Sequence, residues 1–317
     1  MVRIAILDDY QNVALKMADW SQVSTQADVV VFDDHLTDTA AVAERLKGFE
    51  IVCAMRERTP FDRDLIEALF DLKLLVTTGP RNASIDVGAA NERGITVCHT
   101  ASVPTGTPEL TWALILALAR HVPLESSNVR EGRWQTTVGI DLAGKTLGIM
   151  GLGRLGGRVA QVATAFGMNI VGWSQNLTDD RATECGATRV SRDELLAQSD
   201  FVTIHLVLSA RTRGLIGPDE LNRMKSSAYL VNTSRGPIVE EGALIQAIEQ
   251  GVIAGAGLDV YDTEPLPSDH PYRTLPNVVL TPHIGYVTEN SYRMFFSEIV
   301  EDIEAWLANK PIRVLNP

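Results

Sequence analysis

The sequence predicts an α/β protein built on parallel sheets, and three observations support this prediction. A chain of 317 residues is long for one compact core and fits two domains. Short apolar runs alternate with stretches of helical periodicity, which is the pattern of parallel strands covered by helices on both faces. The alternation breaks once, near residue 107, and resumes near residue 145, so two such series follow each other along the chain.

The first series runs from the N-terminus to a strand that ends near residue 97. Its expected strands are Ile4–Leu7, Val29–Phe32, Ile51–Ala54, Leu72–Val76 and Ile95–Val97. Helical stretches such as Ala40–Lys47 and Asp62–Phe70 separate these strands.

The break in the alternation is the segment "TPELTWALILALAR". Thr107 is the expected N-cap and Pro108 the expected first helical residue. The residues that follow are apolar on nearly every face, which predicts a helix buried on all sides, as between two domains. The apolar run Leu110–Ala119 is too short to span a bilayer.

The second series begins with "KTLGIMGLGRLGGRVAQVATAFG". Its later strands are expected at Phe201–Leu206, Tyr229–Asn232, Ala256–Val260 and Val278–Thr281. The chain closes with an amphipathic helix that has Phe296, Ile299, Ile303 and Leu307 on one face.

Composition and charge restrict the possible partners and compartment. The net charge of −12 makes the chain poorly suited to nucleic acid or to anionic membranes. Cys53, Cys98 and Cys185 show no paired spacing, which fits a reducing compartment, and the first two are expected to be buried thiols. We expect no metal site. The N-terminus "MVRIAILDDY" does not resemble a signal peptide, so a cytoplasmic protein is predicted.

A glycine motif opens the second series. Gly151-x-Gly153-x-x-Gly156 follows a strand and begins a helix. The first glycine permits a tight turn, the second lets the backbone approach a pyrophosphate, and the third allows close packing of helix on strand. This context predicts a dinucleotide site. The pair Gly255-x-Gly257 lies inside a strand, and we interpret it as close backbone packing only.

The next strand, in "NIVGWSQNL", departs from the usual dinucleotide pattern. An Asp or Glu normally follows this strand, accepts hydrogen bonds from the ribose hydroxyls and repels a 2′-phosphate. Ser174 occupies that position here, and two neutral residues follow it. The segment 174–180 contains no Lys or Arg, so Arg154 in the glycine turn is the nearest basic candidate by position. We therefore predict NAD or NADP as cofactor, with a modest preference for NADP.

Three later strands end in side chains suited to proton and hydride chemistry. Arg235 follows one strand, Asp259 and then Glu264 follow the next, and His283 follows the third. Ligands of open α/β sheets bind at the carboxyl ends of strands. His283 could deliver a proton to the oxygen of a carbonyl that receives a hydride, and a carboxylate could orient it and favour its charged form. Arg235 could polarise that carbonyl and bind an adjacent carboxylate.

These motifs resemble those of the D-isomer-specific 2-hydroxyacid dehydrogenase family over nearly the whole chain. "GLGRLG", "HLVLSARTRGLI", "VNTSRGPIVEEGAL", "GAGLDVYDTEPLP" and "TPHIGY" occur in the order and spacing of that family. The resemblance implies Arg235 as the electrophilic substrate-binding residue, Glu264 as the partner of the histidine, and His283 as the acid/base.

The resemblance also implies a fold and a set of cofactor contacts. The expected fold has two doubly wound, Rossmann-like or flavodoxin-like domains. A dinucleotide-binding domain at 102–285 is inserted into a substrate domain formed by 1–101 and 286–317, and a homodimer forms around Leu110–Gly144. His205 is expected near the cofactor as a turn residue, and Val207 replaces the proline usual in the family. The implied cofactor contacts are Gly151, Gly153, Arg154, Leu155, Gly156, Ser174, Val207, Thr212, Thr233, Asp259 and Gly285.

The chain departs from the family at the turn that binds the substrate carboxylate. Relatives typically carry Gly-x-Gly there, whereas this chain has "TTGPRNASID". Gly79 is kept, Pro80 lacks an N–H group, and Arg81 replaces the second glycine. Arg56 lies in a loop that the family places at the same cleft. We therefore expect Arg56, Gly79 and Arg81 to bind substrate with Arg235, although Arg81 could equally be a solvated loop residue.

The predicted function is hydride transfer between NAD(P)H and a 2-oxo acid to give a D-2-hydroxy acid, and the reverse. One alternative is formate dehydrogenase, which the segment "SDHPYR" also resembles. Those enzymes pair their histidine with glutamine, so Glu264 argues against that alternative. The other alternative is a nucleotide-sensing corepressor on the same fold. It keeps similar residues, but we find no interaction tail here.

Overall fold

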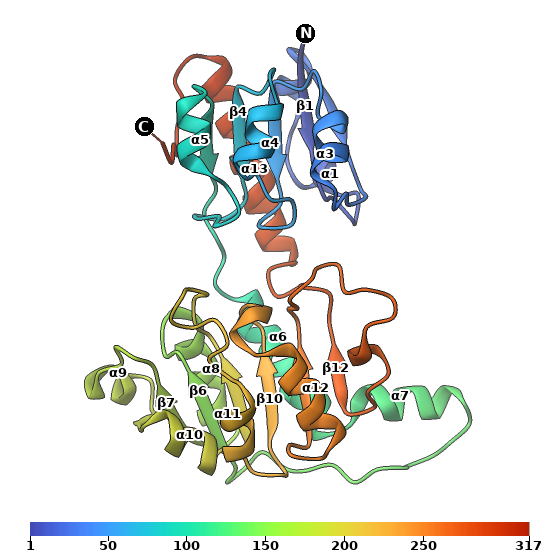
Figure 1. Ribbon diagram of the computed structural model, residues 1–317, viewed down its shortest axis with the longest axis vertical. Helices are drawn as coiled ribbons and strands as arrows, with labels where there is room; N and C mark the ends of the chain where they lie inside the picture. The colour runs from blue at the N-terminus through green and yellow to red at the C-terminus, as the bar shows by residue number, and fades with distance from the viewer. Residues whose placement is uncertain (317) are drawn as a thin grey trace. The chain divides into compact units, whose positions relative to one another are not determined.

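The computed structural model describes residues 1–316, which form two compact units. One unit comprises Met1–Val103 together with the C-terminal segment that begins at Thr288, and the other is Pro104–Val287. Each unit is built on one sheet in which every strand pair is parallel (Figure 1). The predicted α/β class with two parallel sheets is confirmed.

The first unit carries a five-stranded sheet in the order β2-β1-β3-β4-β5. Its strands are β1 (Val2–Ile6), β2 (Ala27–Val31), β3 (Ile51–Ala54), β4 (Leu74–Thr77) and β5 (Thr96–His99). All residues of β3 and β4 are buried, as continuous apolar runs of central parallel strands require. The five predicted strands are confirmed, with ends shifted by one or two residues in all but β3.

Short helices connect these strands, and three of them have an aspartate as N-cap. They are α1 (Ala14–Met17), α2 (Ser21–Ser24), α3 (Thr39–Arg45), α4 (Arg63–Ala68) and α5 (Val87–Glu92). The side chains of Asp38, Asp62 and Asp86 accept hydrogen bonds from the free N–H groups of the first turns of α3, α4 and α5.

The long helix α13 (Glu289–Leu307) completes the first unit from the other end of the chain. Its residues Phe296, Ile299 and Ile303 are buried, whereas Leu307 is only half-buried. The predicted amphipathic face is therefore confirmed except at its last turn. Beyond the helix, Val314 forms an antiparallel bridge with Cys98 in β5, which ties the C-terminal segment to the sheet.

The second unit carries a seven-stranded sheet in the order β12-β11-β10-β9-β6-β7-β8. Its strands are β6 (Thr146–Met150), β7 (Asn169–Trp173), β8 (Thr188–Arg189), β9 (Phe201–Ile204), β10 (Tyr229–Asn232), β11 (Gly255–Leu258) and β12 (Val278–Leu280). The chain runs outward from β6 to β8 and then returns to the opposite side of β6 at β9. This reversal is a topological switch point, at which open α/β sheets bind ligands.

Helices cover both faces of this second sheet. They are α6 (Gly106–Ala119), α7 (Val122–Arg130), α8 (Arg154–Ala165), α9 (Asp179–Glu184), α10 (Arg192–Gln198), α11 (Pro218–Arg223) and α12 (Glu241–Glu249). Two 3-10 turns add η1 (Gly236–Ile238) and η2 (Pro271–Arg273). Apart from α6, α8 and α12, these helices are short or lie near the edges of the sheet (Figure 1).

Two predictions about helix α6 were wrong. The helix begins at Gly106, so Thr107 and Pro108 both lie inside its first turn, where no backbone N–H has a helical partner and proline is tolerated. The Thr107 hydroxyl donates instead to the carbonyl of Gly285, 3.2 Å away. The helix is also not buried on all sides, because it packs on one face of the sheet and leaves Ala113 and Leu116 exposed.

The predicted burial of Cys53 and Cys98 and the close packing at the strand glycines are confirmed. Cys53, Cys98 and Cys185 are all buried free thiols. A Cβ atom on Gly255 would lie 2.1 Å from the carbonyl oxygen of Asn277, and one on Gly257 would lie 3.1 Å from Leu114 of α6. Both glycines therefore permit close packing within the fold. Within residues 1–316, none of the helices combines the length and apolar character that a bilayer crossing requires.

Candidate active site

The glycine turn joins β6 to α8, and the fold itself requires glycine at two of its three positions. Gly151 has a φ of +104°, and a Cβ atom there would lie 2.7 Å from the carbonyl oxygen of His205. A Cβ atom on Gly156 would lie 2.0 Å from the carbonyl oxygen of Gly151, so only glycine lets the helix start this close to the strand. A Cβ atom on Gly153 would meet nothing within 4 Å. The turn is therefore closely packed at Gly151 and Gly156 and open to solvent at Gly153. Open space at the N-terminus of α8 fits the diphosphate of a dinucleotide.

Arg181 supports this turn, a role that no pattern in the sequence indicates. Its Nε donates to the carbonyl of Leu152 at 3.0 Å, and its Nη2 donates to the carbonyl of Gly153 at 3.3 Å. The side chain comes from α9, so the contact spans 28 residues of sequence. A guanidinium group with these two carbonyls fixes the backbone that a phosphate would approach.

The loop after β7 carries the predicted substitution of the ribose acid. Ser174 is half-buried at the end of the strand, and its carbonyl accepts from the N–H of Leu177 at 3.1 Å. The two residues between them are exposed. Arg211, which follows β9, donates through Nη1 to the side-chain oxygen of Gln175 at 3.2 Å. The structure thus brings a cation to a loop that has none of its own.

The hydroxyl of one threonine holds the turn that follows β9 in place. The Thr212 hydroxyl donates to the carbonyl of Val207 at 2.7 Å and accepts from the N–H of Ser209 at 2.8 Å. Val207 is 84% exposed. At the start of this segment, burial lowers the pKa of His205 to about 4, and its Nε2 lies 3.0 Å from the Thr203 hydroxyl. His205 is therefore neutral near pH 7.

The turn after β10 positions Arg235 through its neighbours. The side-chain amide of Asn232 accepts from the N–H of Ser234 and donates to the carbonyl of Arg235, both at 3.0 Å. The Thr233 hydroxyl lies 2.9 Å from the Thr111 hydroxyl of α6. Because both strand and helix hold the turn, the Arg235 backbone has a fixed position at the carboxyl edge of the sheet.

Asp259, at the end of β11, organises the turn that carries the histidine. Its carboxylate accepts from the Thr281 hydroxyl at 2.6 Å and from the N–H groups of Ile284 and Gly285 at 2.8 and 2.9 Å. Burial raises the pKa of Asp259, and these hydrogen bonds oppose that rise. The residue therefore has a structural role that its sequence position did not reveal.

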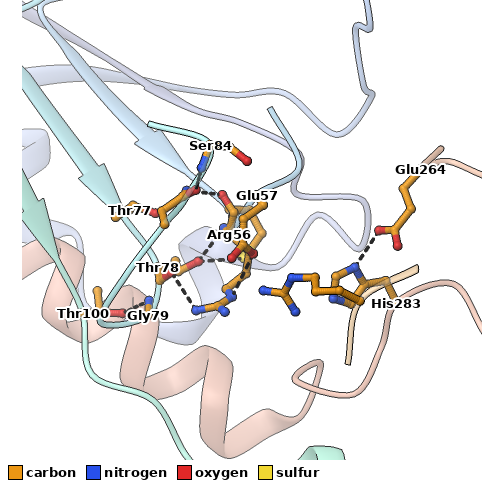
Figure 2. Close-up of polar contacts among 12 residues, drawn as sticks. Arg56, Glu57, Thr77, Thr78, Gly79, Ser84, Thr100, Glu264 and His283 are labelled. Carbon is orange, nitrogen blue, oxygen red and sulfur yellow. Dashed lines mark hydrogen bonds and ion pairs between the residues drawn. The ribbon is translucent and has the colours of Figure 1, made fainter. Parts of the chain in front are cut away.

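Glu264 and His283 are in direct contact, as Figure 2 shows. The Nδ1 atom of His283 lies 2.6 Å from one carboxylate oxygen of Glu264, and the other oxygen accepts from the N–H of Tyr261 at 2.9 Å. The His283 side chain keeps 21% of its surface exposed and the Glu264 side chain 32%, so solvent and small molecules can reach both. His283 has a φ of +53°, a left-handed conformation that the turn after β12 imposes and that is often found at functional sites.

Tyr261 connects the two strand ends that bear this pair. Its buried hydroxyl lies 2.8 Å from the carbonyl oxygen of Thr281 after β12 and 3.2 Å from that of Leu258 at the end of β11. Since its own N–H also holds Glu264, one residue fixes both members of the pair. The sequence analysis missed this residue, because nothing in its local pattern indicates a contact across strands.

Two candidate substrate residues of the first unit, Arg56 and Gly79, lie at the turn after β4 (Figure 2). Arg56 donates through its N–H to the Thr78 hydroxyl at 2.8 Å and through Nη1 to the Thr78 carbonyl at 3.2 Å. The N–H of Gly79 donates to the Thr100 hydroxyl at 2.7 Å. A Cβ atom on Gly79 would lie 1.7 Å from Nη1 of Arg56, so glycine makes room for the guanidinium. Arg81 is exposed on the same turn.

The predicted residues therefore fall into two groups. Arg235, Glu264, His283 and the residues proposed for the cofactor lie at or near the carboxyl ends of strands in the second unit, and the structure brings Glu264 and His283 into contact. Arg56, Gly79 and Arg81 lie together in the first unit. Beyond the prediction, the second unit adds Arg181, Arg211 and Tyr261.

Comparison with known proteins identifies relatives of the whole chain. A glyoxylate reductase from Korarchaeum cryptofilum is 38% identical, covering 86% of this chain and 84% of the relative. A D-3-phosphoglycerate dehydrogenase from Archaeoglobus fulgidus is 39% identical over 82% of this chain, which spans only half of that longer relative. The crystal structure of a phosphoglycerate oxidoreductase from Vibrio cholerae is 39% identical, with a TM-score of 0.93 over 98% of this chain and 100% of that one.

A family model covers more than half of the chain and coincides with the second unit. Residues 112–285 match the NAD-binding domain of D-isomer specific 2-hydroxyacid dehydrogenases. These residues include the glycine turn, Arg235, Glu264 and His283. The chain therefore belongs to the D-isomer specific 2-hydroxyacid dehydrogenase family, an oxidoreductase family with a nicotinamide dinucleotide cofactor.

Proposed function

We propose that this protein reduces a 2-oxo acid to the D-2-hydroxy acid, and catalyses the reverse reaction, with NAD or NADP as cofactor. The observation that carries the proposal is the 2.6 Å contact between Glu264 and His283. This pair lies at the carboxyl edge of the sheet that also bears the glycine turn. An acid/base and a dinucleotide site on one edge suit hydride transfer coupled to proton transfer.

His283 is the proposed proton donor in reduction and the proposed base in oxidation. Its Nδ1 faces Glu264, so Nε2 is the nitrogen left for the substrate oxygen. Glu264 keeps the ring in this orientation and tautomer. When bound, the nicotinamide ring supplies or accepts the hydride.

Arg235 is the proposed electrophile and carboxylate ligand. Its planar fork can bind the substrate carboxylate while its charge polarises the neighbouring carbonyl. From the first unit we propose Arg56, Gly79 and Arg81 as further substrate contacts. The N–H of Gly79 is already bonded to Thr100, so the positive charges of Arg56 and Arg81 are the groups suited to a carboxylate there.

The two units would divide the work between cofactor and substrate. We propose 102–285 as the dinucleotide-binding domain and 1–101 with 286–317 as the substrate domain. The open space above Gly153 and the contacts of Arg181 support a diphosphate at the glycine turn. The proposed cofactor contacts are Gly151, Gly153, Arg154, Leu155, Gly156, Ser174, Val207, Thr212, Thr233, Asp259 and Gly285.

We also propose a cytoplasmic homodimer that acts on a small-molecule substrate and uses neither nucleic acid nor a membrane as partner. The segment around α7, which extends away from the sheet in Figure 1, exposes the apolar side chains of Val122, Leu124, Val129 and Trp134. Exposed apolar surface of this kind marks protein interfaces. It lies within the segment expected to form the dimer.

A steady-state screen tests the proposal. Glyoxylate, hydroxypyruvate and other 2-oxo acids are offered with NADH and with NADPH, and the name of one relative makes glyoxylate a primary candidate. The His283→Ala variant is the control, and it should lose about 10²- to 10⁴-fold in turnover while still binding cofactor. Cofactor binding without turnover of any 2-oxo acid would favour a nucleotide-sensing protein, and full activity of the variant would remove His283 from the mechanism.

A further inference from the structure

The loop that replaces the ribose acid has a cation beside it that comes from a different strand. Arg211 lies 36 residues beyond Gln175 in sequence, and its Nη1 donates to the side-chain oxygen of Gln175 at 3.2 Å. The two loops follow β9 and β7, which flank β6 on either side in the sheet. Both therefore leave the sheet at its carboxyl edge, around the glycine turn.

The backbone on both sides of Arg211 is held in place. The Thr212 hydroxyl bridges the carbonyl of Val207 and the N–H of Ser209, and the N–H of Arg213 donates to the carbonyl of Ser209 at 3.0 Å. Hydrogen bonds within the loop therefore fix its backbone, and Arg211 is an exposed residue of that loop. A guanidinium presented from a fixed turn loses less freedom on binding than one on a mobile chain.

The contact with Gln175 leaves the charge of Arg211 available. Gln175 is a neutral amide, so it accepts a hydrogen bond without compensating the positive charge. Two arginines that follow β7 differ in this respect, since Arg181 pairs with Glu184 at 3.1 Å and Arg189 pairs with Asp179 at 3.3 Å. An anion that displaced Gln175 from Arg211 would gain a charge-assisted, two-pronged contact in exchange for a neutral one.

We propose that Arg211 binds the 2′-phosphate of NADP(H) and is a residue that sets the preference for this cofactor over NAD(H). The proposal rests on the proposed dinucleotide site. In such sites the ribose 2′-hydroxyl lies at the residue that follows the second strand, which here is Ser174 after β7. Ser174 removes the repulsion of an acid, and Arg211 supplies the attraction that the segment 174–180 lacks.

The test compares two nucleotide fragments that differ only in this phosphate. Binding of adenosine 2′,5′-bisphosphate and of adenosine 5′-monophosphate is measured by calorimetry on the wild type, on Arg211→Ala and on Arg223→Ala. Arg223 is an exposed arginine of α11 that pairs with Asp193, so its variant changes the net charge equally without touching the loop.

We expect Arg211→Ala to weaken binding of the bisphosphate about 10-fold or more and binding of the monophosphate less than about 2-fold. Arg223→Ala should leave both affinities unchanged. Raising the salt concentration should shrink the effect of Arg211→Ala, because the contact is solvent-exposed.

Two results would overturn the assignment. Equal losses for both fragments would mean that Arg211 contacts the adenosine or the shared phosphate, and no loss would mean that it contacts neither. Since fragment binding needs no turnover, this result is independent of the screen of 2-oxo acids. A wild type that binds neither fragment would refute the dinucleotide site itself, whereas failure of the screen alone would refute only the proposed reaction.

Discussion

Replacing Glu264 by glutamine should disable the histidine without disturbing the fold. Both oxygens of Glu264 act as acceptors, one for the N–H of Tyr261 at 2.9 Å and one for Nδ1 of His283 at 2.6 Å. A glutamine side chain offers one acceptor and one donor, so it cannot serve both groups. Either Tyr261 loses its partner, or the NH₂ group faces Nδ1 and forces the imidazole proton onto Nε2.

In the second arrangement Nδ1 faces a donor and cannot carry a proton, so the ring cannot become the imidazolium that donates from Nε2 in reduction. The substitution also removes the negative charge that orients the ring and favours its charged form. Loss of an orienting carboxylate of this kind is expected to reduce kcat by about 10²- to 10⁴-fold, at the scale of general acid-base catalysis. Losing the Tyr261 hydrogen bond instead would cost about 1 kcal/mol of stability. The variant should therefore lose most of its activity, whereas its melting temperature should change only slightly.

The assay measures kcat and KM for 2-oxo acid reduction, together with dinucleotide affinity and thermal unfolding. Asp269→Asn is the matched control, since Asp269 is an exposed carboxylate of the same segment. We expect the control to behave as wild type and Glu264→Gln to retain cofactor affinity. Turnover of Glu264→Gln within about twofold of wild type would show that the contact has no role in proton transfer.

Three further predictions concern the substrate turn, the ribose position and a buried acid. Arg81→Ala should raise KM for 2-oxo acids far more than KM for the cofactor, and equal small changes would leave Arg81 a surface residue. Ser174→Asp should lose activity with NADPH sharply and keep activity with NADH, because the acid repels a 2′-phosphate; a wild type that already prefers NADH about a hundredfold would contradict this reasoning. Burial raises the pKa of Asp302, on α13, to about 7, although Arg313 bonds it at 2.9 Å. The folded state then binds more protons than the unfolded state between pH 4 and 7, so the free energy of unfolding should fall with rising pH by up to about 1.4 kcal/mol per unit. Asp302→Asn should flatten this slope in urea titrations at pH 5 to 8, and parallel slopes for both proteins would refute the shift.

The sequence alone determined the class of fold and the chemical groups of the site. Strands β3 and β10 begin and end where predicted, because short apolar runs next to polar residues leave little choice of strand ends. The glycine turn was predictable because Gly151 and Gly156 answer local backbone requirements, and the third glycine completes a known spacing. Glu264 and His283 were predictable as candidates because both follow strands of one parallel sheet, whose carboxyl ends share an edge.

Tertiary structure decided what those groups touch. Thr107, the predicted cap of helix α6, lies inside the helix, and its hydroxyl donates to the carbonyl of Gly285, which lies 178 residues away along the chain. Arg181, Arg211 and Tyr261 enter the site through contacts between different loops or strands. Periodicity and spacing describe neighbours along the chain, whereas these hydrogen bonds exist only once strand order has brought distant turns to one edge. The sequence thus determined which residues could act, and the order of strands in the sheet determined which of them meet.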